Sequence, residues 1–600
     1  MKTYSDQMCD WLVEQGFTHC FFVAGGNIMH FLNSARLRFK CVPVVHEVSA
    51  GIAAEYFNEL DMNDKSKAFA LVTAGPGLTN IVTSIAGANI ESRSLLVIGG
   101  QVKSSDLSLG KVRQRGIQEI DGVSLLKSLC KSAVTLTAPI NKSKFISLVS
   151  KAFRPRKGVI FIEVCLDVQG KPAEEKFNNL PKKSEVNSND LPRATHKQIV
   201  KVKSLLTKAK RPVFLIGGGV SRSDFREIYP KLVELGVPLM STWNGADRIP
   251  HDEPLNWGRP NTWGMRYSNI LIQQSDLVIA IGTRLGLQHT GFNWQQFVPL
   301  GKVIQVDIDK RELTKGHPKL HMKIYSDASY FLDKLLNDSR DFEISFVDWL
   351  NFGNKVKKSI PLSDPENNNF EGYWNPYEFL AQVSKQLING DTLIPSSSGA
   401  SETVAMQAAC IPYGVFTITN KGLASMGYGL AGAIGAAFKT RSRVIHIEGD
   451  GSFSQNLQEL GTVMVNKLPI KIFIFDNRGY ASIKMTQRSY YQGNSIGCDI
   501  ESGLGLPNWI RIFSAYGITC HTIDVVEKFS QNVVDELNDP HPRAFLVPIH
   551  PEQTYFPKIT SEVLADGTMM SRPLHLMTPD LSDFQTLEFL PYLACTVTPD

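Results

Sequence analysis

Residues 444–480 (VIHIEGDGSFSQNLQELGTVMVNKLPIKIFIFDNRGY) contain the side chains best suited to hold a metal ion. One apolar run ends just before Asp450, and a second ends just before Asn477. If the two runs are parallel strands joined by a right-handed crossover, these side chains meet although 27 positions (477 − 450) separate them. A carboxylate, an amide oxygen and the backbone carbonyl of Gly479 suit Mg²⁺, which commonly completes its shell with phosphate oxygens. The segment therefore predicts a magnesium site for a phosphate-bearing ligand.

Two glycines flank the acid of this segment. Gly449 and Gly451 are expected to let the backbone turn tightly at the carboxyl end of the first strand, so that Asp450 faces the crevice where open α/β sheets bind ligands. The alternative interpretation is an ordinary turn and strand end in which the acid and the amide are incidental.

A second acid lies in residues 42–60 (VPVVHEVSAGIAAEYFNEL). Glu47 follows an apolar strand and precedes a helix of small residues, so we expect burial to raise its pKa toward the range useful for proton exchange. An isolated glutamate here would be interpreted as a helix N-terminal acid or as half of an ion pair. We interpret the neighbouring His46 as structural rather than as a proton carrier.

The order of these and further motifs resembles the acetolactate synthases, which depend on thiamine diphosphate. The resemblance extends over nearly all of residues 1–550. Its motifs are FFVAGG, His-Glu, TAGPGLTN, VIGGQV, SSSGASE, NKGLASMGYGLAGAIGAA and the Gly-Asp-Gly segment. Two positions depart from the family pattern: Asp476 stands where asparagine is frequent, and Ile117, next to Gln118, where an aromatic residue is frequent.

The resemblance implies site residues. Glu47 would activate the cofactor by stabilising the imino form of its aminopyrimidine, and Gln101 would line the reacting centre. Met426, otherwise a plain core residue, would be the wedge that holds the cofactor bent; the catalytic set is then Glu47, Gln101 and Met426. Gly25 and Gly26 would allow close backbone approach, unless they form a plain turn. The full cofactor-binding set is Gly25, Gly26, Glu47, Ser398, Gly399, Ala424, Met426, Gly449, Asp450, Gly451, Ser452, Asn477, Gly479 and Tyr480, with Asp450, Asn477 and Gly479 on the metal.

The expected fold is α/β, with three doubly wound parallel-sheet domains. Short runs rich in Val, Ile and Phe alternate with longer helical patterns, which is typical of parallel sheets. Glycine and alanine spacing in residues 420–437 allows a helix there to pack closely on a neighbour. The expected boundaries are residues 1–172 for a pyrimidine-binding domain, 190–348 for a middle domain, 372–555 for a diphosphate-binding domain and 556–600 for a proline-bearing tail, irregular and wrapped over the surface or a site mouth.

Composition excludes several classes of protein. The formal charge of +5 comes from interspersed Lys, Arg, Asp and Glu, so no nucleic-acid partner is expected. Nine scattered cysteines favour reduced thiols in the cytoplasm, and no apolar run approaches the roughly 20 residues of a membrane helix. The resemblance implies a homodimer or homotetramer with active sites between subunits.

The expected reaction is decarboxylation of a 2-keto acid, with pyruvate as the expected donor, followed by ligation of the acyl unit to a carbonyl acceptor. The acceptor stays open between a keto acid and a keto-sugar, because residues 481–494 and 551–577 depart from typical acetolactate synthases. A non-ligating decarboxylase or an oxidase is the main alternative, and a silent regulatory subunit another. Flavin (FAD) also stays open: the triglycine at 217–219 is an incomplete dinucleotide fingerprint, which argues against a dehydrogenase.

Overall fold

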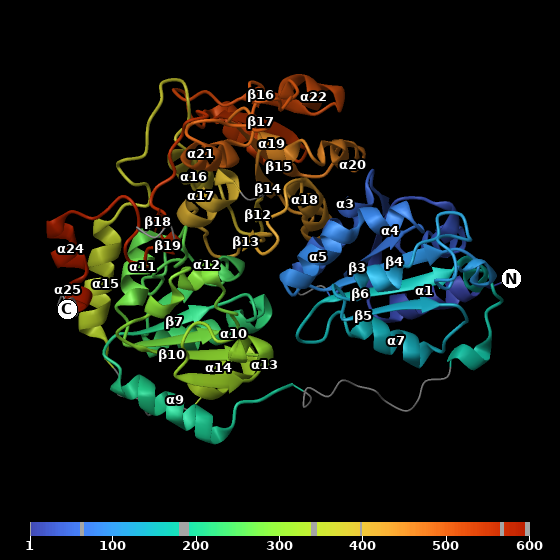
Figure 1. The fold of residues 1–600 in the computed structure, drawn as a ribbon, viewed down its shortest axis with the longest axis horizontal. Helices are drawn as coiled ribbons and strands as arrows, with labels where there is room; N and C mark the ends of the chain where they lie inside the picture. The colour runs from blue at the N-terminus through green and yellow to red at the C-terminus, as the bar shows by residue number, and fades with distance from the viewer. Residues whose placement is uncertain are drawn as a thin grey trace. The chain divides into compact units, whose positions relative to one another are not determined.

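The computed structural model describes residues 2–60, 65–178, 191–337, 345–396, 399–563 and 569–594. These residues form two compact units, each described by itself. The first comprises Met1–Val186, Thr392–Gly399 and Asn420–Val547, and the second comprises Asn187–Asp391, Ala400–Thr419 and Pro548–Asp600. The prediction of three parallel α/β sheets is confirmed: two lie in the first unit and one in the second (Figure 1). Residues 179–190, between the expected pyrimidine-binding and middle domains, lie outside the described residues.

The first sheet has the strand order β2-β1-β3-β4-β6-β5, with parallel pairing throughout. Strands β4 and β6 are buried along their whole length, as apolar strands covered by helices on both faces must be. The elements are β1 (Phe17–Phe22), β2 (Lys40–Pro43), β3 (Lys67–Val72), β4 (Leu95–Gln101), β5 (Ser132–Leu136), β6 (Val159–Cys165), α1 (Tyr4–Glu14), α2 (Met29–Ala35), α3 (Glu47–Glu59), α4 (Pro76–Asn80), α5 (Val82–Ile90), α6 (Gly122–Leu126), α7 (Lys142–Ser150) and α8 (Leu166–Gln169).

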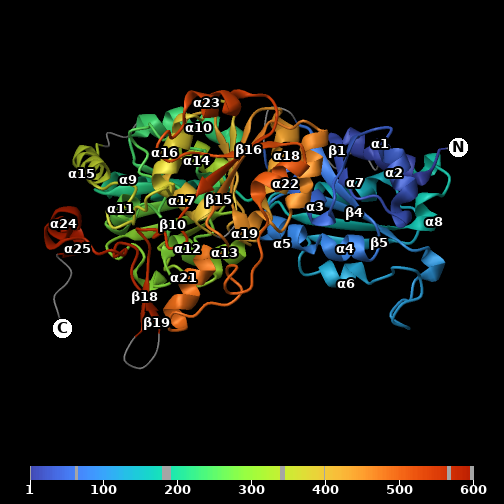
Figure 2. The ribbon, with the colours of Figure 1, turned by 90° about the horizontal axis from the view of Figure 1, so that it is seen from above.

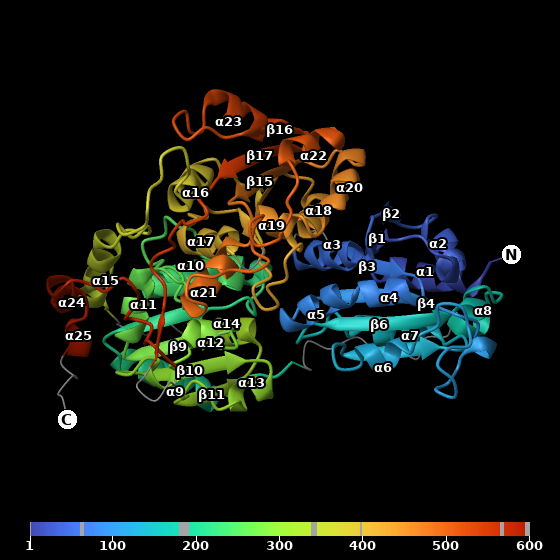
Figure 3. The same cartoon turned by 45° about the horizontal axis from the view of Figure 1, so that its top comes forward.

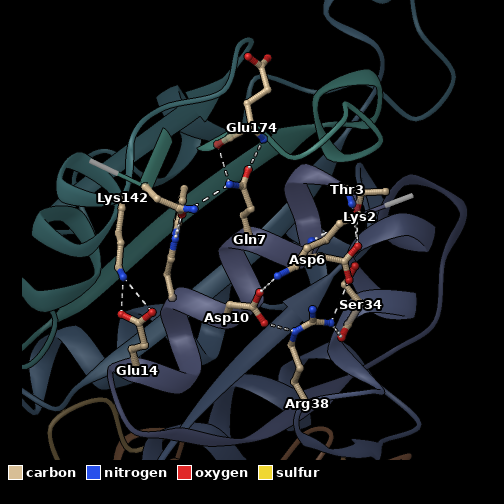
Figure 4. Close-up of polar contacts among 12 residues, drawn as sticks. Lys2, Thr3, Asp6, Gln7, Asp10, Glu14, Ser34, Arg38, Lys142 and Glu174 are labelled. Atoms are coloured by element: carbon tan, nitrogen blue, oxygen red, sulfur yellow. Dashed lines mark hydrogen bonds and ion pairs between the residues drawn. The ribbon is translucent and has the colours of Figure 1, made fainter. Parts of the chain in front are cut away.

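Helix α1 is tied to this domain by charged side chains (Figure 4). Thr3 and Asp6 form a capping box at its first turn, which satisfies backbone N–H groups that a helix start leaves open. Arg38, just beyond α2, donates to Asp6 at 2.9 Å and to Asp10 at 2.5 Å. The guanidinium thus joins the end of α2 to two turns of α1.

The part of the other sheet that lies in the first unit has the order β12-β14-β15-β17-β16. Its central strands β14 and β15 pair in parallel, so that their carboxyl ends emerge side by side. The elements are β12 (Thr392–Pro395), β14 (Val444–Gly449), β15 (Ile470–Asp476), β16 (Thr519–Thr522), β17 (Arg543–Pro548), α18 (Gly429–Thr440), α19 (Asp450–Phe453), the 3-10 helix η8 (Leu457–Glu459), α20 (Leu460–Val465), α21 (Ala481–Tyr490), α22 (Trp509–Ala515) and α23 (Gln531–Asn538).

Helices α3 and α18 lie against each other within the first unit, as Figures 2 and 3 both show. A Cβ at Gly432 would stand 2.6 Å from the ring of Tyr56, and one at Gly435 would collide with the backbone of Ala53. Only glycine lets the two helix backbones approach this closely. The predicted close packing of the glycine- and alanine-rich helix is therefore confirmed.

The second unit contains the middle sheet, with the order β11-β10-β9-β7-β8. Its elements are β7 (Pro212–Ile216), β8 (Leu239–Ser241), β9 (Leu277–Ile281), β10 (Lys302–Asp307), β11 (Met322–Tyr325), the short β13 (Phe416–Thr417), α9 (His196–Lys208), α10 (Arg222–Leu235), α11 (Arg266–Gln273), α12 (Leu287–Thr290), α13 (Lys310–Thr314), α14 (Ala328–Leu336), α15 (Val347–Ser359), α16 (Pro376–Lys385) and α17 (Ala400–Ala408).

The C-terminal tail is more ordered than its prolines suggested. It forms the antiparallel pair β18 (Ser561–Val563) and β19 (Met569–Ser571), then α24 (Asp583–Phe589) and α25 (Pro591–Ala594). Its apolar side chains join the core of the second unit instead of only covering a surface; they are Leu574, Phe589, Leu590 and Leu593. None of the helices in the described ranges is long and apolar enough to cross a membrane.

Candidate active site

Asp450 and Asn477 are brought together by the pairing of β14 with β15. Gly449, the last residue of β14, is opposite Phe475 of β15, so the next residues leave the same edge of the sheet. The side-chain oxygen of Asn477 lies 3.1 Å from Oδ1 of Asp450 and 2.8 Å from the carbonyl oxygen of Gly479. The predicted meeting of carboxylate, amide and carbonyl is therefore present.

These three oxygens suit a small divalent cation. Ligands at about 2.1 Å in an octahedron stand about 3.0 Å apart, close to the separations around Asn477. If the Asn477 amide is rotated by 180°, its nitrogen donates hydrogen bonds to Oδ1 of Asp450 and to the carbonyl oxygen of Gly479. These two acceptors therefore require either a hydrogen-bond donor or a cation between them. Burial, and then the charge of Asp476, raise the pKa of Asp450 well above its usual value, which a bound cation would offset. The donor set thus fits Mg²⁺.

Two of the three glycines in this segment, Gly451 and Gly479, are required by close approach to other parts of the chain. Gly449 has an ordinary φ of −75°, and a Cβ there would meet nothing within 4 Å. Gly451 is helical, and its Cβ would stand 2.5 Å from the ring of Tyr480. Gly479 combines a φ of 140° with a position against the carbonyl of Cys498. The chain passes directly from β14 into α19 here, which is the predicted tight turn, but neither Gly449 nor Gly451 has a positive φ. Close approach selects Gly451 and Gly479, while the space at Gly449 is open.

The loop that carries Met426 is supported by two hydrogen bonds of the buried Ser452 hydroxyl. Ser452 donates to Glu448 at 2.5 Å and accepts the backbone N–H of Gly427 at 3.0 Å. Ala424 takes a positive φ of 55°, which turns the loop before Met426. Met426 itself is half-buried, which disfavours the interpretation of a plain core residue. The structure thus places Ser452, predicted to bind the cofactor, as a support of the Met426 loop.

Glu47 is the first residue of α3 and is only 8% exposed. Nδ2 of Asn80, at the end of α4, donates to its Oε2 at 2.9 Å. His46 is the N-cap of the same helix, because its Nδ1 accepts the N–H of Val48. The structural interpretation of His46 therefore agrees with the geometry, and the carboxyl group of Glu47 keeps Oε1 for another partner.

Gln101 at the end of β4 is engaged within the protein. Its Nε2 donates to the carbonyl of Ile120 at 3.0 Å and to Glu163 at 3.1 Å, and its Oε1 accepts the N–H of Val102. Burial raises the pKa of Glu163 to about 7 although Gln101 and Thr135 both donate to it. The role of Gln101 at the reacting centre stays a prediction.

The remaining predicted residues of the first unit are placed as follows. A Cβ at Gly25 would collide with the side chain of Thr73, whereas one at Gly26 would meet nothing within 4 Å, so close approach is required only at Gly25. Gly399 is half-buried, and Ser398 lies outside the described residues. Gln118 is exposed, with a positive φ of 64°.

The triglycine turn of the middle domain does not call for a dinucleotide. Cβ atoms at Gly217 and Gly219 would collide with the backbone of Gly282, and one at Gly218 would stand 3.1 Å from Asn244. Packing between two strand ends therefore explains these glycines. Flavin binding stays a prediction.

Sequence reasoning missed three polar residues at this site: the exposed Asn80 and the buried Glu459 and Glu163. Asn80, which holds Glu47, ends the TAGPGLTN motif, so its motif membership could have indicated it. Glu459 accepts backbone N–H groups just before Glu47, and Glu163 holds Gln101. Neither glutamate has a local sequence signal, because each partner lies far away along the chain.

Comparisons with known proteins agree with this geometry. Three protein-family models match: the N-terminal TPP binding domain of thiamine pyrophosphate enzymes over residues 2–125, their central domain over 199–335, and their C-terminal TPP binding domain over 398–547. A probable acetolactate synthase large subunit of Methanococcus aeolicus is 30% identical over 78% of this chain and 79% of its own length. The acetolactate synthase large subunit of Cyanidium caldarium is 29% identical, over 86% and 88%. Acetolactate synthase 3, chloroplastic, of Brassica napus is 26% identical, over 94% and 87%. The chain therefore belongs to the acetolactate synthase-like family of thiamine-diphosphate-dependent enzymes.

Proposed function

We propose that the protein decarboxylates a 2-keto acid, with pyruvate as donor, and joins the acyl unit to a second keto acid. Thiamine diphosphate, when bound, supplies the carbanion chemistry for both steps. The observation that carries the proposal is the set formed by Asp450, Asn477 and Gly479, which fits Mg²⁺, together with the buried carboxyl group of Glu47. The acetolactate synthase relatives support the choice of a keto acid as acceptor.

The metal end of the site binds and orients. Asp450, Asn477 and the carbonyl of Gly479 would hold Mg²⁺ and, through it, the diphosphate. The open space beside Gly449 would let phosphate oxygens approach the backbone. Met426 is half-buried on the loop that Ser452 supports, and it would contact the cofactor and help to hold it bent.

Glu47 is the group proposed to hold the proton that activates the cofactor. Its carboxyl group would hold a proton at N1' of the aminopyrimidine, the position at which a neighbouring acid favours the imino form. Asn80 donates to Oε2 and leaves Oε1 to make that contact. Glu47 itself is only 8% exposed, so little water competes for the hydrogen bonds of its carboxyl group.

The finer assignments belong to the same proposal. The other residues predicted to bind the cofactor or line the centre, including Gln101, keep those roles. The domain boundaries near residues 172, 190, 348, 372 and 555, a homodimer or homotetramer with sites between subunits, and a cytoplasmic location are proposed on the sequence and the family resemblance alone. A keto-sugar acceptor likewise rests on sequence alone.

The test compares wild type and Glu47→Gln with pyruvate, Mg²⁺ and thiamine diphosphate, measuring released carbon dioxide and the ligated product. Loss of a positioned acid–base group should lower the rate by roughly 10²- to 10⁴-fold. Glu59→Gln is the matched control, because Glu59 ends the same helix α3. Equal decarboxylation by wild type and Glu47→Gln would overturn the role of Glu47, and carbon dioxide without ligated product would indicate a plain decarboxylase.

A further inference from the structure

Glu459 is a fully buried carboxylate in the 3-10 helix η8, which lies between Asp450 and Asn477 within residues 444–480. Its Oε1 accepts the backbone N–H of Val45 and that of His46, each at 3.1 Å. Its Oε2 accepts the hydroxyl of Thr462 at 2.8 Å. The carboxylate therefore binds the backbone of Val45 and His46, the two residues before Glu47, and this contact is called the grip of Glu459 below.

Burying a carboxylate costs free energy unless hydrogen bonds replace its water. Here two backbone N–H groups and one hydroxyl do so, and bonds to an ionised acceptor are shorter and stronger than neutral ones. Val45 and Glu459 are 414 positions apart, so no local turn requires the contact. Satisfying two N–H groups alone would need only water or a neutral acceptor.

The place of the grip is informative. Val45 and His46 leave β2 and enter α3, whose first residue is Glu47. His46 caps that helix, so the backbone at residues 45–46 sets where α3 begins and in which direction the carboxyl group of Glu47 projects. Glu459 is nine positions after Asp450 (459 − 450), so one segment carries both the metal ligand and the grip.

We propose that Glu459 is a positioning residue for the reaction, which holds Glu47 at the orientation that cofactor activation requires. It acts through the backbone of residues 45–46 and touches neither cofactor nor substrate. This inference rests on the proposed role of Glu47.

The test uses the full-length protein and the variant Glu459→Gln, which keeps the shape of the side chain but replaces the carboxylate by a neutral amide, whose oxygen accepts hydrogen bonds more weakly. Backbone hydrogen exchange of peptides covering residues 42–48, measured by mass spectrometry without cofactor, should rise by about tenfold, the loss expected for about one net hydrogen bond. Exchange of the C2 proton of added thiamine diphosphate should slow by about tenfold or more, because small misplacements of a catalytic group are costly. Cofactor affinity should stay within about threefold, since no predicted ligand is removed.

Glu55→Gln is the matched control. Glu55 is also fully buried on α3, but it bonds Arg93 and Tyr428 in the middle of the helix. It should lower the unfolding temperature without changing either exchange rate. Thr462→Val, which removes one donor to Glu459, should give a smaller change of the same kind as Glu459→Gln and serves if that variant does not fold.

Unchanged C2 exchange in Glu459→Gln, or in Thr462→Val where the first variant does not fold, would overturn the inference, and so would unchanged backbone exchange at 42–48. Glu47→Gln separates the two proposals. If Glu47→Gln abolishes C2 exchange and loss of the grip does not slow it, only the positioning role fails. If Glu47→Gln leaves C2 exchange intact, the proposed function of Glu47 fails first.

Discussion

The side-chain amide of Asn477 lies 3.1 Å from Oδ1 of Asp450, with the carbonyl oxygen of Gly479 on its other side. Among the described residues, no cluster of three or more His, Cys, Asp or Glu side chains could hold a metal. A site built from one carboxylate, one amide and one carbonyl is therefore invisible to a search for charged ligands alone, and it suits a hard cation that shares its shell with phosphate.

Asn477→Ala removes the middle oxygen of this set. We expect Mg²⁺-dependent binding of thiamine diphosphate to weaken at least as much as the roughly 10- to 100-fold that loss of an outer-shell partner costs. Calorimetric titration with and without Mg²⁺ measures the loss. Asn466→Ala, at the end of α20, makes the same change away from the site and should leave affinity unaltered. Equal affinities in both variants would contradict the metal assignment.

Alanine at Gly449 and at Gly451 should separate a binding role from a packing role. Gly451→Ala brings a methyl group 2.5 Å from the ring of Tyr480, and overpacking of this kind typically costs about 1–3 kcal/mol. Gly449→Ala meets nothing within 4 Å, so the unfolding temperature should hold while cofactor affinity falls. Thermal melts paired with cofactor titrations give both numbers. Unchanged affinity in Gly449→Ala would show that the phosphates do not approach there.

The strands of the site could be predicted from sequence because apolar runs in a parallel sheet are local signals. The apolar runs that end just before Asp450 and Asn477 are β14 and β15, and their pairing follows from the handedness of the crossover. The roles of Gly449 and Gly451 could not be predicted, because sequence does not separate a tight turn from close approach by a distant ring. The tail was misjudged because prolines limit helix length but not burial.

The buried carboxylates could not be predicted for a different reason. Glu459 and Glu163 stand in apolar surroundings where a glutamate is ordinarily interpreted as the solvated face of an element. Their partners lie on other elements: Val45 for Glu459, and Gln101 and Thr135 for Glu163. Only the tertiary structure shows that these side chains are satisfied inside the protein.

Arg38→Met should destabilise the first unit in a pH-dependent way. Burial opposes ionisation of Asp6 and Asp10, but hydrogen bonds and the charge of Arg38 outweigh it and lower both pKa values. Carboxylates with lowered pKa values stabilise above their usual 3.8, and that stability is lost as pH falls. At neutral pH we expect a loss of about 1 kcal/mol, because the ion pairs are partly exposed.

Thermal melts of wild type and Arg38→Met measure this effect. The difference in unfolding temperature should be about 2–4 °C at neutral pH and should shrink in acid and in high salt. Arg36→Met is the control, since Arg36 bonds Asn33 at the exposed surface. A difference that is independent of both pH and salt would mean that Arg38 contributes packing and not charge.

The raised pKa of Glu163 predicts that the folded protein loses stability as the pH rises. Burial raises its pKa from 4.5 to about 7, so the folded protein holds a proton that the unfolded chain releases. Stability from a raised pKa is complete below the unfolded value and is lost as pH rises through the folded value. At about 1.4 kcal/mol for each pH unit, the loss between these limits is about 3 kcal/mol.

Glu163→Gln keeps the shape of the side chain but cannot ionise, so its unfolding temperature should fall less than that of wild type between about pH 5 and 8. Glu119→Gln is the matched control: backbone N–H groups of Ser108, Arg115 and Gly116 outweigh burial and lower the pKa of Glu119 to about 2, so its contribution is constant over that range. Wild type and Glu119→Gln should therefore run parallel, and Glu163→Gln should diverge from both. Because Glu163 accepts a hydrogen bond from Gln101, the same rise in pH should also change the environment at the end of β4. If the unfolding temperature of Glu163→Gln changes with pH as that of wild type does, Glu163 is ionised throughout this range.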